Sequence, residues 1–135
     1  MQNNPKNLPE KEKSPEETSA HVIVRMFPSD ANPAGNVFGG EILKHIDMVA
    51  GIVAQRHAQS NAVTVSMDSV NFIKPVFVGN VLKLNARINY VHNSSMEIEV
   101  KAEAEDIITG IKTITGTAFV TFVALDKNGK PTHVP

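Results

Sequence analysis

The segment from residue 41 to residue 57 constrains the fold most, because it is a predicted helix that is apolar on two sides. Its main apolar arc contains Ile42, Leu43, Ile46, Val49, Ala50 and Val53. At 100° per residue these side chains fill an arc of roughly 120°, and Met48 and Ile52 lie opposite it. Such a helix needs two covers. We expect a sheet on one side and a second subunit on the other.

The rest of the chain supplies the strands of such a sheet. Alternating or β-branched segments predict strands at residues 21–27, 62–74, 81–91, 95–105 and 111–125. The third and fourth form a hairpin with a three-residue loop, which places Arg87 opposite Glu99 and Lys83 opposite Glu103. A phase change near Asp68 predicts a bulge. The sequence therefore predicts an α+β fold with a five-stranded, mostly antiparallel sheet wrapped around one long central helix.

Residues 1–18 differ from the rest of the chain in composition. They hold three prolines and seven charged residues and very little apolar surface. We expect a disordered N-terminal tail at 1–18 and a single domain at 19–135.

Composition excludes several classes of partner and site. A net charge of −1 and the lack of a Lys/Arg cluster argue against nucleic-acid binding. The chain has no cysteine, and its five histidines lack metal-ligand spacing, so no metal is expected. No uncharged stretch of about 18 apolar residues occurs, so no membrane partner is expected either. These features favour a cytoplasmic protein.

The loop before the helix carries the candidate functional residues. Pro33, Gly35, Gly39 and Gly40 indicate a loop with special backbone demands. In the helix, Asp47 borders the apolar arc beside the small residues of positions 50, 51 and 54. Acidic side chains are rarely buried without a partner or a function. We therefore expect another surface to pack near Asp47.

Four stretches resemble a known family. They are Asn-Pro-Ala-Gly-Asn-Val-Phe-Gly-Gly at 32–40 followed by Asp47, Ala-Gly-Ile-Val-Ala at 50–54, Thr-Val-Ser-Met-Asp-Ser-Val-Asn-Phe at 64–72, and Asp-Lys-Asn-Gly-Lys-Pro at 126–131. From about residue 22 to residue 135 the chain resembles the hot-dog fold acyl-CoA thioesterases, specifically the single-domain bacterial relatives of cytosolic acyl-CoA hydrolase. The resemblance implies a homodimer, in some members a trimer of dimers. It also implies hydrolysis of acyl-CoA to a free acid and CoA, a role in fatty acid metabolism, and no cofactor, since CoA is part of the substrate.

The resemblance also assigns residues. Asp47 matches the catalytic carboxylate, Asn36 the catalytic asparagine, and Gly39 and Gly40 the glycines at the helix start. Backbone N–H groups at a helix N-terminus suit the oxyanion that thioester hydrolysis creates. Asp47 can act as general base on a water or as a nucleophile that forms an anhydride, and the sequence leaves both open. Asn36 can hold the water or the thioester oxygen.

The candidate substrate-binding residues are Phe38, Gly39, Gly40, Ser66, Ser69 and Lys74. Ser66 and Ser69 lack the Gly-x-Ser-x-Gly context of a nucleophile, so we place them as lining for the acyl or pantetheine channel. Lys74 follows the bulged strand and is a candidate contact for a CoA phosphate.

Two other functions fit the same fold. One is a non-catalytic acyl-CoA-binding or regulatory module, and the other is a hot-dog dehydratase. The pair Asp47 and Asn36 favours hydrolysis over binding, and a dehydratase usually pairs its carboxylate with a histidine, which the glycine loop lacks. Fold alone does not decide between them.

Overall fold

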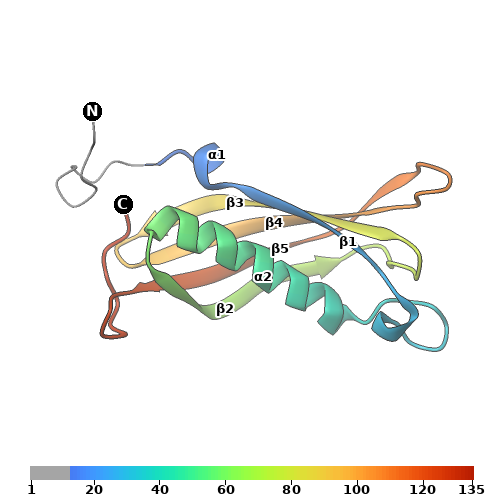
Figure 1. Cartoon of the computed structure of the whole chain (residues 1–135), viewed down its shortest axis with the longest axis horizontal. Coiled ribbons are helices and arrows are strands. Elements are labelled where there is room, and N and C mark those ends of the chain that lie inside the picture. Colours follow the sequence, from blue (N-terminus) through green and yellow to red (C-terminus); the bar gives the residue numbers. More distant parts are fainter. Residues whose placement is uncertain (1–12) are drawn as a thin grey trace.

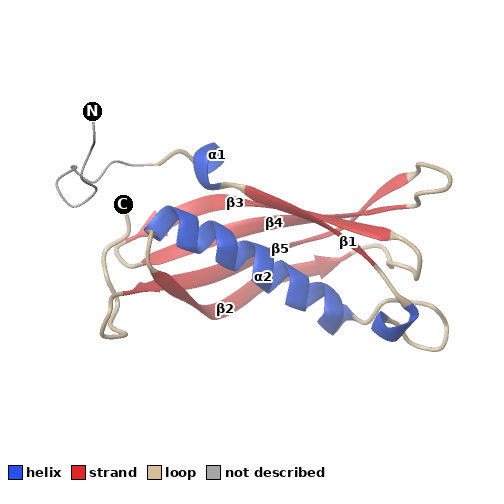
Figure 2. Cartoon of the chain, in the orientation of Figure 1, coloured by secondary structure: helices blue, strands red, loops and turns tan. Residues whose placement is uncertain are grey.

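The computed structural model describes residues 13–135 as one sheet, one long helix and two short helical turns (Figures 1 and 2). The elements in chain order are α1 (Pro15–Thr18), β1 (Ala20–Arg25), the 3-10 turn η2 (Pro28–Asp30), α2 (Gly39–Ala58), β2 (Asn61–Phe72), β3 (Val81–His92), β4 (Ser95–Glu105) and β5 (Lys112–Leu125). All five expected strands are present, and the expected helix begins two residues earlier than predicted. Neither α2 nor any other helix within residues 13–135 is both long and apolar enough to cross a membrane.

The five strands form a single antiparallel sheet in the order β1-β3-β4-β5-β2. Helix α2 crosses one face of this sheet (Figure 1). The main apolar arc of the helix is in the core: Ile42, Ile46, Val49, Ala50 and Val53 are buried and Leu43 is half-buried. Met48 and Ile52, on the opposite side, are 59% and 44% exposed. The predicted α+β fold is confirmed, and residues 13–135 leave one side of α2 without a cover.

The β3–β4 hairpin has the predicted register but not the predicted loop. Arg87 pairs with Glu99 and Lys83 with Glu103, and Lys83 Nζ lies 3.7 Å from Glu103 Oε1. The turn contains two residues rather than three, with Asn93 in the left-handed region at φ 51°. A bulge between Ile88 and Tyr90 adds one residue to β3 and restores the register. Loop length was mispredicted because a shorter turn plus a bulge gives the same facing pairs.

Strand β2 is bent by two irregularities, one between Thr64 and Ser66 and one between Asp68 and Asn71. The second is the predicted bulge, and Ser69 within it has a φ of 51°. The neighbouring strand is built around this bend. A Cβ on Gly116 of β5 would collide with the backbone oxygen of Asn71, so only glycine fits there.

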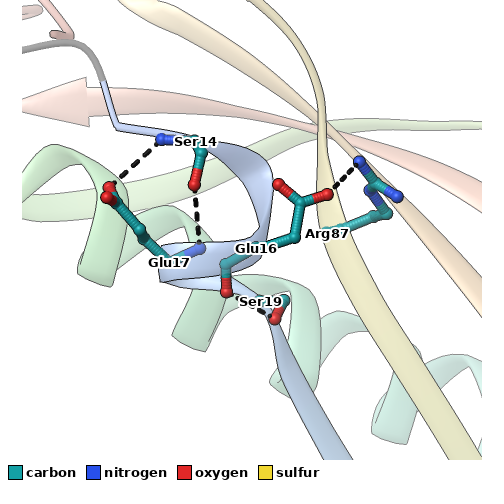
Figure 3. Close-up of polar contacts among 5 residues, drawn as sticks. All are labelled: Ser14, Glu16, Glu17, Ser19 and Arg87. Atoms are coloured by element: carbon teal, nitrogen blue, oxygen red, sulfur yellow. Dashed lines mark hydrogen bonds and ion pairs between the residues drawn. The ribbon is translucent and has the colours of Figure 1, made fainter.

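The predicted disordered tail is wrong for its last residues, since residues 13–18 are ordered against α2 and β3. Residues 1–12 lie outside the described residues. Ser14 and Glu17 form a capping box at α1, and Glu16 Oε1 lies 3.0 Å from Arg87 Nη2 (Figure 3). Thr18 is buried. The composition of this segment is polar, but its polar groups find partners in the folded domain, so composition alone misplaced the boundary.

The C-terminal end of α2 is closed by segments from both ends of the described chain. His57 is 2% exposed. Its Nδ1 lies 3.5 Å from Thr18 Oγ1, and its Nε2 lies 3.1 Å from the backbone oxygen of Pro135. Lys13 Nζ donates to the carbonyl oxygen of His57 at 3.0 Å. These contacts fix α2 at one end of the molecule, whereas the β4–β5 hairpin lies at the other end (Figure 1).

Candidate active site

Asp47 is paired with a hydroxyl group that the sequence analysis did not select. Thr64 Oγ1, on β2, donates a hydrogen bond of 2.6 Å to Asp47 Oδ1, on α2. Hydrogen bonds to an ionised acceptor are short and strong, so this bond fixes the orientation of the carboxylate. Asp47 is half-buried. Within residues 13–135 its Oδ2 has no hydrogen-bond partner, so that oxygen is available for a water or a substrate.

The sequence held only a weak signal for Thr64. The residue lies in the Thr-Val-Ser-Met-Asp stretch that supported the family resemblance. A threonine on the polar face of a predicted strand usually faces solvent, so local reasoning gave it no function. Only the packing of α2 across the sheet, next to the bend in β2, brings its hydroxyl to Asp47.

The loop from residue 31 to residue 38 is organised by Asn32. Its side-chain oxygen accepts from the backbone N–H groups of Ala34, at 3.0 Å, and Asn36, at 3.1 Å. The backbone N–H of Asn32 donates to the oxygen of Asn36 at 2.9 Å. Gly35 has a φ of 89°, which requires glycine. Asn32 was not a predicted site residue, yet it determines the shape of the predicted loop.

Asn36 is held mainly through its backbone. Besides its bonds to Asn32, it forms an isolated antiparallel bridge with Phe77. Its side chain is half-buried and makes no hydrogen bond to another described residue. Its role as the catalytic asparagine stays a prediction.

Gly39 and Gly40 are the first two residues of α2, where backbone N–H groups have no acceptor within the helix. The preceding residue, Phe38, is 52% exposed and gives the helix no side-chain cap. Neither glycine has a positive φ, so the loop turn does not require them. A Cβ on Gly40 would meet nothing within 4 Å, and one on Gly39 would lie 3.6 Å from the ring of Phe72. The missing side chains leave the N–H donors open to a ligand.

The remaining predicted side chains make no hydrogen bond to Asp47 or Thr64 within residues 13–135. Ser66 Oγ donates to Asp68 Oδ2 at 3.1 Å, and Ser69 lies exposed in the β2 bulge. Lys74 is exposed and lines a pocket of about 390 Å³ with Pro75, Phe77 and Asp106. That pocket does not include Asp47 or Thr64. Among residues 13–135 no three His, Asp or Glu side chains are placed to bind a metal ion.

A match to a protein-family profile identifies the family of this chain. The pattern described as the thioesterase superfamily matches residues 34–111, more than half of the chain. The chain belongs to this superfamily. A Bacillus subtilis protein, the uncharacterized acyl-CoA thioester hydrolase YkhA, is 45% identical over 82% of this chain. The cytosolic acyl coenzyme A thioester hydrolase of rat is 41% identical over 87% of it. The chain spans 64% of the length of the first protein and 32% of the second.

Solved structures of this superfamily share the fold. An acyl-CoA hydrolase from Staphylococcus aureus, in complex with butyryl coenzyme A and coenzyme A, is 39% identical with a TM-score of 0.87, over 91% of this chain and 75% of that one. The hexameric thioesterase y2039 of Yersinia pestis is 32% identical with a TM-score of 0.80, over 84% of this chain and 94% of that one. The predicted hot-dog fold is confirmed.

Variants of the Staphylococcus aureus enzyme point to three positions. One aspartate, one threonine and one asparagine were each replaced by alanine in separate structures. The separations between these three positions along that chain equal the separations between Asn32, Asp47 and Thr64 here. Asn36 does not fit this spacing.

Proposed function

We propose that this chain hydrolyses the thioester of acyl-CoA substrates to a free carboxylic acid and CoA. The observation that carries the proposal is the half-buried Asp47 carboxylate, held by Thr64 with one oxygen left over. A carboxylate whose second oxygen is available can deprotonate water or attack a carbonyl. Hydrolysis consumes only water, so the proposed reaction needs no cofactor, and CoA enters as part of the substrate.

The working site combines two subunits. Gly40 and Asp47 are seven residues apart on one helix, which places them about 10 Å apart along its axis. A single thioester carbonyl is too small to contact both directly. Asp47 of one chain therefore acts with the loop and helix start of a second chain. The uncovered Met48 and Ile52 and the exposed Val63 and Val65 of the edge strand β2 supply the dimer surface.

In the proposed site, Thr64 positions Asp47, and the N–H groups of Gly39 and Gly40 stabilise the oxyanion. With Asp47 as base, water adds to the carbonyl carbon, the C–S bond breaks, and the CoA thiolate takes the proton. With Asp47 as nucleophile, CoA leaves first and water then hydrolyses the anhydride. A single turnover in ¹⁸O-water that leaves label in Asp47 identifies the second route, because only water attack on the Asp47 carbonyl of the anhydride puts the label there.

The loop asparagines and the substrate-binding residues complete the proposal. Asn32 is the stronger candidate for the asparagine that contacts the reacting groups, because its oxygen is used by the loop while its N–H donors remain. Asn36 is the alternative. We also propose that Phe38, Ser66 and Ser69 line the acyl or pantetheine path and that Lys74 contacts a CoA phosphate. We further propose a cytoplasmic role in fatty acid metabolism.

The test is release of free thiol from a panel of acyl-CoAs of short, medium and long chain. We expect turnover with at least one chain length, and Asp47→Asn lowers kcat by about 10³-fold or more while keeping side-chain volume and fold. The matched control is Glu97→Gln, which neutralises a carboxylate of β4 that bonds Asn89 instead. Binding of acyl-CoA without turnover would make the chain a binding module, and near-normal activity in Asp47→Asn would remove Asp47 from the mechanism.

A further inference from the structure

Gly51 is a glycine that neither the backbone nor the packing of this chain requires. Of the eight glycines, four have a positive φ, Gly116 has no room for a side chain, and Gly39 and Gly40 begin α2. Gly51 lies in the middle of the 20-residue helix α2 and has no positive φ. Glycine is less favourable than alanine inside a helix, because it loses more conformational freedom on folding. Its presence at position 51 therefore needs another explanation.

The space beside Gly51 is bounded by one aromatic ring. A Cβ on Gly51 would lie 3.6 Å from Cε2 and 3.7 Å from Cζ of Phe122, on β5, which are ordinary van der Waals distances. Within residues 13–135 no other atom lies within 4 Å of that position, apart from the two chain neighbours of Gly51 and the nearby helix backbone. An alanine would fit there. The missing side chain leaves space that the described residues do not fill.

This space lies one helical turn from the proposed catalytic carboxylate. Asp47 and Gly51 are four residues apart, so they lie on the same side of α2, about 6 Å apart along its axis. The sheet gives the same placement. Thr64, which donates to Asp47, is the register partner of Phe122 across β2 and β5. Two residues of the helix and two of the sheet therefore surround one region.

The polarity of the surroundings differs on the two sides of Asp47. Helix α2 and strand β2 run in opposite directions (Figure 1). Toward the start of the helix, β2 continues from Thr64 to Ser66 and Asp68, whose side chains bond each other. Toward the end of the helix, the side chains along these elements and β5 are apolar: Ala54, Ala58, Ala62, Phe122 and Ala124. An alkyl chain suits the second side, and the amide groups of pantetheine suit the first.

We propose that the acyl chain of the substrate runs from Asp47 across Gly51, and that Gly51 admits straight acyl groups long enough to pass it. The inference rests on the proposed function and deepens it by naming the substrate class. With carbon–carbon bonds of about 1.5 Å, about five bonds span the rise from Asp47 to Gly51, so acyl groups of about six carbons or more reach it. Acetyl and butyryl groups end before Gly51. A larger side chain at position 51 would occupy the path of the longer chains.

The test is isothermal titration calorimetry with S-ethyl-, S-butyl-, S-hexyl- and S-octyl-CoA, thioethers that have no bond to hydrolyse. Burial of one methylene is worth about fourfold in affinity, so we expect the wild type to bind S-octyl-CoA about tenfold or more tightly than S-butyl-CoA. Gly51→Leu should lose this gain, because its side chain fills the space beside Phe122. The affinity for S-ethyl-CoA should stay unchanged.

A second variant and a matched control make the test independent of folding defects. Gly51→Ala folds because its Cβ fits against Phe122, and it should lower the advantage of S-octyl-CoA by about fourfold, the worth of one methylene. Gln55→Leu introduces leucine at an exposed position about 12 Å from Asp47 along the helix axis, beyond the reach of an octyl chain. This control should keep the wild-type profile. Circular dichroism and light scattering compare the fold and the molar mass of all variants.

Three results overturn the proposal: wild-type affinities that do not rise with chain length, an unchanged profile in Gly51→Leu, or an equal loss for all four ligands. An equal loss with a lower molar mass would show that a second copy of the chain packs against Gly51 instead. None of these results depends on catalysis. Length-dependent binding without thiol release from octanoyl-CoA rejects the proposed hydrolase activity and leaves the role of Gly51 standing. Thiol release with length-independent binding does the reverse.

Discussion

The two ends of helix α2 differ in how completely their polar groups are satisfied. At the start, Phe38 gives no side-chain cap and the N–H groups of Gly39 and Gly40 have no acceptor within the helix. At the end, Lys13 donates to the carbonyl oxygens of Arg56, at 3.3 Å, and His57, at 3.0 Å. Gln59 adopts the left-handed conformation and closes the last turn.

This difference puts residues of the proposed site at one end of the helix and structural contacts at the other. Donors left open at a helix N-terminus are available to an anionic or polarised group of a ligand. Carbonyl groups bonded at the C-terminus anchor the helix and the chain ends around it. We therefore expect substitutions near the start to change activity with little effect on folding, and substitutions near the end to do the reverse.

Of the substitutions that compare the two ends, the largest effect is expected in the loop before α2. Asn32→Ala should lower kcat by about 10²- to 10³-fold, because it removes a polar group from the proposed site and two bonds to the loop backbone. Asn36→Ala should cost less than tenfold, because the contacts of Asn36 are made by its backbone. Steady-state kinetics on the best acyl-CoA measures both. The reverse order would restore Asn36 as the catalytic asparagine.

The second-largest effect is expected at the C-terminal end of α2. His57→Ala should lower the free energy of unfolding by about 2–4 kcal/mol, because it leaves a cavity and removes the partner of Thr18 and Pro135. The kcat should change less than twofold. Urea unfolding at one fixed protein concentration gives the energy, and His21→Ala on β1 is the exposed control. A loss of kcat in folded His57→Ala would show that the two ends are coupled.

The smallest effect concerns Lys13 and alkaline pH. Partial burial lowers the pKa of Lys13 below 10.5, although Glu17 opposes the shift. Between the folded-state pKa and 10.5 the unfolded chain therefore binds more protons, so this group makes stability rise with pH in that window. Urea unfolding at pH 8 and at pH 10.5 gives the free energy of unfolding of the wild type and of Lys13→Met. Between these two pH values the wild type should gain stability relative to Lys13→Met. A difference that is constant with pH would contradict this expectation.

Residues 39–58 and 13–18 show what could be read from the sequence. The apolar arc of α2 was predictable because a helical period imposes the burial of every third or fourth residue. Asp47 was predictable because a carboxylate beside that arc is costly without a function. The ordered segment at 13–18 was not, since its partners Arg87 and His57 are distant in sequence.

The sequence by itself determined the long helix, the five strands along the chain, the facing pairs of the β3–β4 hairpin and the β2 bulge, and it singled out Asp47 as a candidate. These depend on periodicity and on pairing between neighbouring segments, which local composition encodes. Tertiary structure alone decided that Thr64 holds Asp47, that Asn32 shapes the loop, and that Thr18 and Pro135 close on His57. Each of these depends on a contact between segments far apart in the chain, and such contacts form only when α2 packs across the bent sheet.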